Sequence, residues 1–397
     1  MKYKLKDIFD LQMGKTPSRN NIEYWNTKDF KWISISDLTK AHGYISETKE
    51  YISERAVSES GIKIIPANTV VMSFKLSIGK TAITSEDMYS NEAIMAFHDK
   101  HVVEILPEYI FYIFKYKKWD EDSNNAVMGK TLNKAILSEA EIEICSIEEQ
   151  RVIVDILDNM MSVLESRGTE LDLLDNLIKA RFVEMFGDPV QNEKGWKTKP
   201  LLDMGNCKNG MNFHYDDCGV EINCLGVGDF KNLSVIENTE ILPMVSLNEM
   251  PSEEYLLKDD DIVFVRSNGN KALVGRSLAV YPGDVPTAFS GFCIRYRKHD
   301  DEVTVPYLLR VLKAESIRLK MAGRGANIQN LNQQVLETLI IPVPPKELQL
   351  EFAAFVHQVD KSKLLSLIKL LEQLITYLYN IFIIYRQDKG EEVEDHE

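Results

Sequence analysis

Long hydrophobic runs are missing from this chain of 397 residues. No stretch of about 18 uncharged apolar residues occurs, so the sequence predicts no membrane-spanning helix. The amino terminus is polar and charged, and it lacks the apolar segment of a secretory signal peptide. We therefore expect a cytoplasmic protein that does not bind a membrane.

Cysteine is scarce and unevenly placed. Four of the five cysteines lie in the second half of the chain, and their number is odd. This distribution favours reduced thiols over a disulfide framework. The five are Cys145, Cys207, Cys218, Cys224 and Cys293.

Sequence motifs of catalysis are also absent. The Gly-Val-Gly at 226–228 and the Gly-Arg-Gly at 323–325 lack the strand-to-helix context and the third glycine of a dinucleotide site. No GxxxxGK[ST] phosphate loop, nucleophile elbow or Asn-Pro-Pro-aromatic methyltransferase signature occurs. His98 and His101 have no cysteine or carboxylate cluster that would complete a metal site. We expect a non-catalytic protein with no cofactor or metal of its own.

The net charge of −15 is not spread evenly. Residues 147–190 contain 4 basic and 10 acidic side chains, and residues 344–397 contain 6 and 10, so these two segments together contribute −10. The remaining segments, 1–146 and 191–343, are close to neutral, with 19 against 21 and 17 against 20. Each of the latter is able to present a basic face, so the charge permits DNA binding without indicating it.

The most informative feature that is present is a duplication. Residues 132–137 (LNKAIL) match residues 331–336 (LNQQVL), and Gln150 matches Gln349 at the same offset of 199 residues. Weaker matches pair Gly14 with Gly210 and Ser90 with Ser290. Two copies of one domain plus helix predict a molecule with pseudo-two-fold symmetry and two equivalent sites.

Two long helices are predicted, one after each copy. Residues 146–149 (SIEE) form a capping box, and the Gly-Asp-Pro at 187–189 is a stop signal, so the first helix should span 147–187. Prolines 344 and 345 should start the second helix, which spans 344–387, before an acidic disordered tail at 388–397.

Apolar residues at alternating spacings of four and three define a coiled-coil seam on both helices. The stripes should pack on each other as a dedicated spacer, although an ordinary core is the alternative reading. Arg167, Arg181 and Lys363 interrupt them. The predicted interface residues are Ile153, Leu157, Met160, Leu164, Leu171, Leu174, Ile178, Phe352, Val356, Val359, Leu367, Leu370, Leu374 and Ile381.

The segments 1–146 and 188–343 are predicted to be strand-rich domains of an α+β fold. Short β-branched and aromatic runs such as 31–35, 69–74, 80–83 and 261–265 are separated by Gly, Asn and Asp turns. Residues 107–119 and 305–320 have helical patterns that should close each domain.

A family resemblance now emerges. The run from Lys179 to Pro189 (KARFVEMFGDP), the Leu132-Asn133 segment and the following Glu149-Gln150 resemble the specificity subunit of type I restriction-modification systems. The resemblance covers nearly the whole chain. The second copy departs from it, because its matching phrase at 378–383 (LYNIFI) is degenerate and Leu348-Gln349 replaces Glu-Gln.

The resemblance implies a recognition device with two tandem target recognition domains, separated by two long helices that form an antiparallel coiled coil. Each domain reads one half of a bipartite sequence in double-stranded DNA. Two methyltransferase (M) subunits dock on the helices and bring S-adenosylmethionine to a flipped adenine, and restriction/translocase (R) subunits join for cleavage. The chain itself would be non-catalytic.

Candidate DNA contacts follow from the chemistry of base and phosphate recognition, which uses Arg, Lys, Asn, Gln and Ser on loops. A solvated surface charge is the alternative for each. The candidates are Lys15, Arg19, Lys75, Ser77, Lys80, Lys130 and Thr131 in the first domain, and Arg266, Asn268, Asn270, Lys271, Arg276, Arg324 and Asn327 in the second.

Two other function classes stay open. One is a stand-alone DNA-binding regulator, or a coiled-coil scaffold, without a methyltransferase partner. The other is an enzyme with all activities fused in one chain, against which the missing motifs argue. A regulator should bind DNA well alone, whereas a specificity subunit should depend on its partners, because its own acidic field opposes the phosphates.

Overall fold

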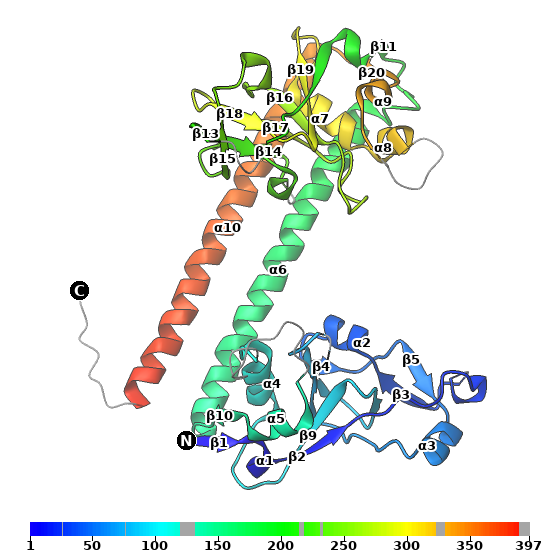
Figure 1. The fold of residues 1–397 in the computed structure, drawn as a ribbon, viewed down its shortest axis with the longest axis vertical. Helices are drawn as coiled ribbons and strands as arrows, with labels where there is room; N and C mark the ends of the chain where they lie inside the picture. Colours follow the sequence, from blue (N-terminus) through cyan, green and yellow to red (C-terminus); the bar gives the residue numbers. More distant parts are fainter. Residues whose placement is uncertain are drawn as a thin grey trace. The chain divides into compact units, whose positions relative to one another are not determined.

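The computed structural model describes residues 1–25, 27–75, 77–119, 132–213, 218–230, 233–322 and 330–388 (Figure 1). The chain divides into two compact units. The first is Met1–Ser166 together with the last part of the chain from Leu370, and the second is Arg167–Lys369. Each unit thus holds one strand-rich domain and a part of each long helix.

The first domain has a five-stranded sheet in the order β2-β9-β6-β7-β4 and a three-stranded sheet in the order β5-β3-β8. A separate antiparallel pair, β1 and β10, connects the start of the chain to the residues before the first long helix. The strands are β1 Lys2–Lys4, β2 Phe9–Met13, β3 Phe30–Ile33, β4 Tyr44–Ile45, β5 Glu50–Ile52, β6 Val70–Ser73, β7 Thr81–Thr84, β8 Tyr89–Ser90, β9 Ile94–Asp99 and β10 Glu141–Glu143. The helices are α1 Leu5–Ile8, η1 Ile22–Tyr24, α2 Ile35–Lys40, α3 Glu54–Ser60, α4 Pro107–Tyr116 and α5 Lys134–Glu139.

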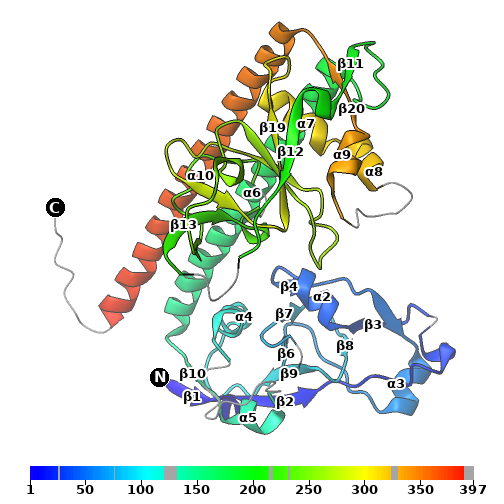
Figure 2. The same ribbon diagram turned by 45° about the horizontal axis from the view of Figure 1, so that its top comes forward.

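The second domain repeats this plan. Its sheets have the orders β12-β19-β16-β17-β14 and β15-β13-β18, and β11 pairs with β20. The strands are β11 Lys197–Pro200, β12 Gly205–Asn209, β13 Val220–Leu225, β14 Val235–Ile236, β15 Met244–Leu247, β16 Asp261–Val265, β17 Ser277–Val280, β18 Thr287–Phe289, β19 Cys293–Lys298 and β20 Ile340–Val343. The helices are η2 Leu201–Asp203, η3 Val227–Asp229, η4 Glu253–Tyr255, α7 Val305–Lys313, α8 Glu315–Ala322 and α9 Gln333–Glu337. In Figure 2, β12 and β19 lie side by side, as their pairing requires.

The predicted α+β fold and its duplication are confirmed strand by strand. The hydrogen bond from Gly14 N to Ile94 O (3.0 Å) has its counterpart from Gly210 N to Cys293 O (3.1 Å), which sets an offset of 199 residues in this strand. The match of Ser90 with Ser290 was therefore wrong by one residue. Ser90 corresponds to Phe289, since their carbonyls accept from Lys15 N and Met211 N respectively.

A buried glutamine joins each domain to its long helix. The amide of Gln150 accepts from Leu106 N (2.9 Å) and donates to Glu104 O (2.9 Å) and Cys145 O (3.0 Å). Gln349 repeats these bonds with Thr304 N (2.8 Å), Glu302 O (2.9 Å) and Pro344 O (2.9 Å). Both side chains are fully buried, so the repeated glutamine satisfies three backbone groups that would otherwise be orphaned.

The long helices are α6, Ile147–Phe186, and α10, Lys346–Asp388. The predicted capping box starts α6: Ser146 Oγ accepts from Glu149 N (3.3 Å), and the Glu149 carboxylate accepts from Ser146 N (2.8 Å). Gly187 follows the helix at φ +75°, the left-handed conformation expected of a C-terminal glycine. Helix α10 begins at Lys346, two residues after the predicted start at residue 344, so both prolines precede the helix.

Within the second unit the two helices run antiparallel. Arg181 on α6 pairs with Glu351 on α10 (2.8 Å), Asp175 pairs with Lys363 (2.6 Å), and Glu170 accepts from Ser366 Oγ (2.9 Å). Two of the charges that interrupt the apolar stripes therefore form ion pairs between the helices.

An aromatic cluster lies where α6, α7 and α10 meet. The rings of Phe182 and Phe186 pack against Phe352 with centroid distances of 5.6 and 5.5 Å, and Tyr307 stacks on Phe182 at 5.8 Å. Phe352 and Tyr307 are completely buried. The cluster makes both helices part of the second domain's core.

The predicted helix seam is shared between several partners. Leu174, Ile178, Phe352, Val356 and Val359 belong to the second domain's core. Ile153 and Leu157 pack instead against the core of the first domain. Met160, Leu171, Leu370 and Leu374 are partly exposed, and Leu164 and Leu367 are exposed. The side chain of Ile381 lies outside the described residues, so a continuous seam stays a prediction.

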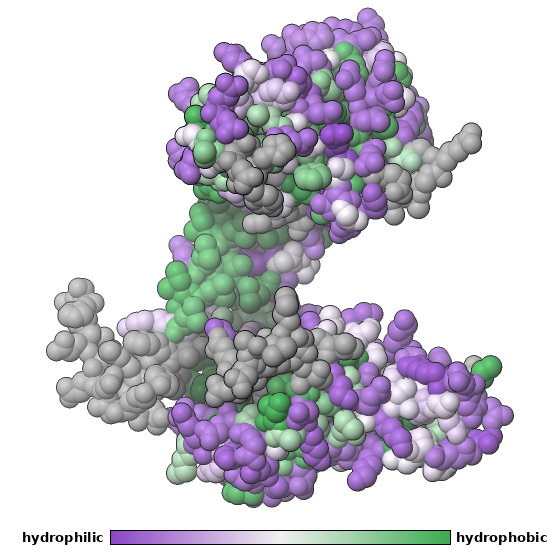
Figure 3. Space-filling view, viewed as in Figure 1, coloured by the Kyte–Doolittle hydropathy of each residue, from purple (hydrophilic) through white to green (hydrophobic). Residues whose placement is uncertain are grey.

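Apolar residues of α10 remain uncovered in its middle part. Leu364, Leu371 and Leu378 are each about 60% exposed, and Ile375 is 65% exposed. Figure 3 shows this stretch as hydrophobic surface. No helix among the described residues is both long enough and apolar enough to span a bilayer.

Candidate nucleic-acid interface

The duplicated backbone brings three loops together at one end of each domain. In the first domain these are residues 14–19, 74–80 and 90–93, which we call the first edge; Lys15 N bonds to Ser90 O (2.8 Å) and Phe74 N to Ala93 O (3.0 Å). The second edge comprises residues 210–213, 266–276 and 290–293, with Arg266 N bonded to Phe292 O (2.8 Å). All the described candidate DNA contacts lie on these edges.

A glycine is required at the centre of each edge. A Cβ atom on Gly14 would lie 2.2 Å from the carbonyl oxygen of Asn91, and one on Gly210 would lie 2.2 Å from that of Ser290. Both distances are far below van der Waals contact with backbone atoms. The shared glycine is thus a packing requirement of the scaffold, and it positions the variable side chains that follow it.

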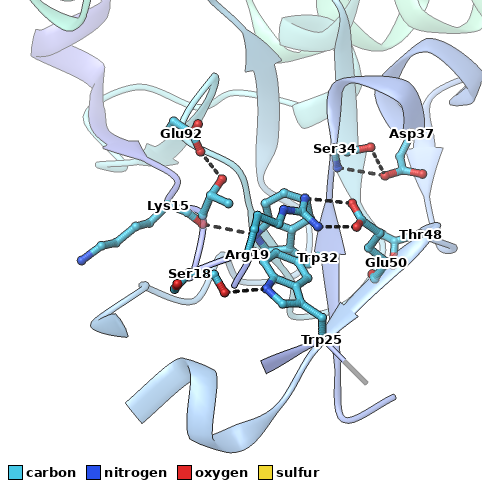
Figure 4. A network of polar contacts seen from close by, with 11 residues as sticks. Lys15, Ser18, Arg19, Trp25, Trp32, Ser34, Asp37, Thr48, Glu50 and Glu92 are labelled. Atoms are coloured by element: carbon cyan, nitrogen blue, oxygen red, sulfur yellow. Dashed lines mark hydrogen bonds and ion pairs between the residues drawn. The ribbon is translucent and has the colours of Figure 1, made fainter. Parts of the chain in front are cut away.

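Two tryptophans fix the loop that follows Gly14 (Figure 4). The indole nitrogen of Trp32 donates to Lys15 O (3.2 Å), and that of Trp25 donates to Ser18 O (3.0 Å). The ring of Trp25 packs edge-on against Trp32 with a centroid distance of 4.9 Å. The loop is therefore held rigidly, which a reading element needs.

Arg19 is already engaged within this loop. Its guanidinium lies 3.7 Å from the centroid of the Trp25 ring, and both of its terminal nitrogens donate to the carboxylate of Glu50, one of them at 3.1 Å. A bidentate, stacked arginine is pre-organised but occupied. The arrangement favours a positioning role for Arg19 in the described conformation. The ammonium of Lys15 donates to the carbonyl of Ser60.

The turn between β6 and β7 carries the other candidates of the first edge. Ser73 Oγ donates to Ser77 O and accepts from Lys80 N (3.0 Å), so Ser77 and Lys80 sit on a closed turn. Lys75 is partly buried, with its ammonium 5.2 Å from the Phe74 ring centroid. Lys80 is exposed.

Glu92 is a residue of this edge that the sequence interpretation missed. Thr16 donates to its carboxylate, and this bond, with lesser help from Lys75 and Arg19, holds the pKa of Glu92 below its ordinary value. The residue therefore stays ionised at neutral pH. A carboxylate amid cations is able to accept from the amino group of cytosine, so Glu92 is a candidate base contact.

The second edge is built differently. Arg266 donates to Gly291 O (3.0 Å), and its own carbonyl accepts from Leu331 N (2.8 Å). Asn268 and Asn270 use their side-chain oxygens to accept from Asn270 N (2.8 Å) and Ala272 N (3.1 Å). These three residues shape the long loop.

The cations of this loop follow the two asparagines. Lys271 and Arg276 lie partly buried on it. Arg318 of α8, which sequence reasoning missed, donates to Gly275 O (3.0 Å) and Val274 O (3.2 Å) and so supports the loop from behind. Burial and the neighbouring Arg276 lower the pKa of Arg318.

Phe292 is a second missed residue. Its side chain is 61% exposed at the tip of the second edge, whereas its counterpart Ala93 is buried. An exposed ring beside cations is a stacking platform for an unpaired base or a wedge between base pairs. No local sequence pattern marks it, because isolated exposed aromatics are common.

Four of the predicted contacts, Lys130, Thr131, Arg324 and Asn327, lie outside the described residues. For the remaining candidates the structure gives positions, and their roles toward DNA stay predictions.

The described residues contain no cluster of three or more His, Cys, Asp or Glu side chains suited to hold a metal ion. Two of the cysteines are poorly placed for covalent chemistry. Burial raises the pKa of Cys207 and of Cys224 to about 12, which keeps both thiols protonated and poorly nucleophilic at neutral pH.

Comparison with known proteins identifies relatives over most of the chain. A family model described as "Type I restriction modification DNA specificity domain" matches residues 1–174 and again residues 193–376. A type I restriction enzyme MjaIX specificity subunit from Methanocaldococcus jannaschii is 26% identical over 377 residues, which cover 89% of this chain and 85% of that protein.

Solved structures share the fold. A chain from a structure described as "Structural basis underlying complex assembly and conformational transition of the type I R-M system" superposes with a TM-score of 0.58 at 14% identity, covering 97% of this chain and 96% of the other. The type I restriction-modification S subunit from M. genitalium gives 0.51 at 14% identity, with 97% and 95% covered.

Proposed function

The chain belongs to the type I restriction-modification DNA specificity family, and we propose that each of its two domains reads one half of a bipartite target in double-stranded DNA. The observation that carries the proposal is the duplicated edge. One backbone arrangement, centred on Gly14 and on Gly210, presents two unrelated sets of polar side chains. A shared scaffold with divergent tips is what two independent readers of different sequences require.

The chemistry of the edges suits contact with a duplex. At the first edge, Lys15, Lys75 and Lys80 supply donors for phosphates, and Glu92 supplies an acceptor for a base. At the second edge, Lys271 and Arg276 supply the donors and Phe292 an apolar surface. Arg266, Asn268 and Asn270 act mainly by holding the loop.

The helices provide the proposed sites for partner subunits. We propose that two methyltransferase subunits cover the exposed apolar residues of α10 and the adjoining face of α6, and that restriction subunits join the assembled complex. The methyltransferases bring S-adenosylmethionine, so this chain recognises the target sequence and its partners carry out the methylation. Such a complex acts on chromosomal and invading DNA, which fits the expected cytoplasmic location.

The decisive experiment is co-expression with candidate methyltransferase subunits followed by single-molecule sequencing of methylated adenines. We expect a split motif with two fixed halves and a constant gap. Replacing residues 191–343 by the corresponding segment of another family member should change one half of the motif and leave the other intact. A continuous motif, or a change in both halves, would contradict the two-reader proposal.

The stand-alone regulator remains the second candidate. It predicts tight, sequence-specific DNA binding by the purified chain and no stable complex with methyltransferase subunits. Measuring DNA affinity with and without these subunits separates the two, because only a specificity subunit should gain affinity from its partners.

A further inference from the structure

A cavity of about 240 Å³ lies inside the second unit, between the second domain and the helices. Its walls come from β14, β17, α7 and the facing sides of α6 and α10, all within residues 167–369. A cavity of about 150 Å³ is enough to bind benzene, so this one has room for an aromatic ring with one or two substituents.

About half of the lining residues are apolar, and the others are polar or charged. Val235, Leu309, Phe352 and Val356 line the cavity together with Ile178 and Ala279. Ligand sites typically combine such a lining with a few polar groups that fix orientation.

Three cations face the cavity, and they differ in what they already bind. Lys363 is neutralised, since its ammonium lies 2.6 Å from Asp175 and 3.0 Å from Asp360. Lys313 donates to the hydroxyl of Ser234 (2.7 Å), and its ammonium forms no ion pair with a carboxylate among the described residues. Arg310 forms no hydrogen bond or ion pair with any described residue, although it is partly buried.

Arg310 and Lys313 lie close together, and within the described residues neither forms a direct ion pair, although Asp175 lies near enough to act on both. Arg310 and Lys313 are three residues apart on α7 and so share one face of the helix. Burial, with a smaller contribution from the neighbouring Arg310, lowers the pKa of Lys313 to about 8. The remaining titratable lining groups are Glu237 and His357, which are both exposed, and the phenol of Tyr281. An anion beside Arg310 and Lys313 would relieve this desolvated positive charge.

The equivalent position in the first domain is filled. Tyr112 stands where the second domain has Arg310; its ring is buried, and its hydroxyl donates to Asp158 of α6 (2.5 Å). Tyr44 stands where the second domain has Val235 and donates to Glu108 (2.6 Å). The cavity is thus not a general consequence of the duplicated scaffold.

We propose that this cavity binds a small organic carboxylate with a ring-sized apolar body, its carboxylate held by Arg310 and Lys313. The guanidinium fork matches the two carboxylate oxygens, and the apolar wall takes the ring. A phosphate monoester fits less well, because it carries nearly two negative charges and would lie near Asp175 and Asp360. The ligand would contact α7, α6 and α10 together, and so would tie the second domain to the helices.

The test uses the full chain and calorimetric titration with benzoate, phenylacetate and indole-3-acetate, alongside benzamide and phenyl phosphate. We expect at least one carboxylate to bind roughly tenfold more tightly than the amide or the phosphate. Arg310→Met should weaken that binding by roughly tenfold or more, and Arg310→Tyr, which transplants the residue of the first domain, should abolish it. Lys115→Met, at the position that corresponds to Lys313, is the matched control and should bind like the wild type.

The proposal is overturned if no carboxylate binds at millimolar concentration, if benzamide binds equally well, or if Arg310→Met leaves the affinity unchanged. Should one variant fail to unfold cooperatively, the comparison of carboxylate with amide on the wild-type chain still decides the question. DNA reading is not involved, so this result stands apart from the outcome of the methylation experiment.

Discussion

The two domains are alike where each one meets its long helix, a place that we call the joint, and they differ in the side chains of their edges. Gln150 and Gln349 make the same three hydrogen bonds where each domain meets its helix, and Gly14 and Gly210 make the same close approach at each edge. Beyond these positions the side chains diverge: Glu92 and two tryptophans serve the first edge, whereas Arg266 and Phe292 serve the second. The comparison teaches that the repeat conserves backbone geometry and leaves surface chemistry free.

The two domains also differ in buried side chains, and one of these differences should have the largest effect on the free energy of unfolding. Arg297 binds the fully buried Asp261 through two bonds of 2.7 and 2.6 Å, while His98 and Thr69 stand at the matching positions of the first domain. Arg297→Met should lower the free energy of unfolding by about 4 kcal/mol, because it leaves a buried carboxylate without its partner. Urea unfolding monitored by circular dichroism measures the change.

His98→Leu is the matched control. The Nε2 atom of His98 has no hydrogen-bond partner among the described residues, so this change should cost less than about 1 kcal/mol. Equal costs in the two domains would show that the ion pair adds nothing to the second.

Removing the buried glutamine of the joint should destabilise both halves of the molecule by equal amounts. Gln150→Leu and Gln349→Leu each remove three hydrogen bonds and leave one N–H and two carbonyls unsatisfied in the interior. We expect a loss of about 3 kcal/mol in each case. Hydrogen exchange of the amides of Leu106 and Thr304 reports each joint separately. A loss in only one half would break the equivalence that the structure indicates.

Substitution of Lys313 should change the free energy of unfolding by a smaller amount, and the change should depend on pH. Burial lowers its pKa from 10.5 to about 8, so the unfolded chain binds more protons between these values, and stability rises with pH across that window. Below about pH 8 the folded state bears the full cost of the buried charge. Lys313→Met should therefore stabilise the protein by about 2 kcal/mol near neutral pH, after allowance for the lost bond to Ser234.

The gain should shrink as the pH approaches about 10.5. Burial also lowers the pKa of the matching Lys115, although Glu165 opposes the shift, so Lys115→Met should act in the same direction and less strongly. Unfolding curves at a series of pH values test both variants, and a stabilisation independent of pH would contradict this account.

The smallest effects concern DNA. Lys15→Ala should weaken binding of the assembled methyltransferase complex to the first half-site, and Lys271→Ala to the second, each by about 1 kcal/mol, or roughly fivefold. Each change should also reduce the salt dependence of binding by about one counterion. Arg266→Ala should affect the second half-site more broadly, since it frees the loop at Gly291. The test is to measure the affinity of each variant complex for duplexes altered in one half-site at a time. Affinities equal to those of the wild type would show that these residues do not contact DNA.

Much of the scaffold could be predicted from the chain alone. The capping box at Ser146, the stop at Gly187 and the strand around Val70 depend on local chemistry, and all three are confirmed. The offset between the copies was readable near Gln150, where identity is high. It slipped by one residue at Ser90, because a lone serine match carries less weight than the backbone register that only folding reveals.

The candidate site was harder to predict because the state of a side chain depends on distant partners. Arg19 is a basic loop residue in sequence, but Glu50 and Trp25 occupy its guanidinium. In the sequence, Arg181 and Lys363 only interrupt the apolar stripes. In the structure they pair with Glu351 and Asp175 on the facing helix. Neither contact follows from periodicity, which gives the face of a helix but not what it meets.

The aromatic cluster of Phe182, Phe186, Tyr307 and Phe352 has a consequence for synthesis on the ribosome. Among the described residues, the hydrophobic core of the first domain contains none beyond Met161, so this core can form while the rest of the chain is still being made. The second core needs Phe352, which is made 166 residues after Phe186, roughly ten to thirty seconds later at ordinary rates of translation. The two domains therefore fold one after the other. During that interval Phe182 and Phe186 of α6 lack their packing partner Phe352.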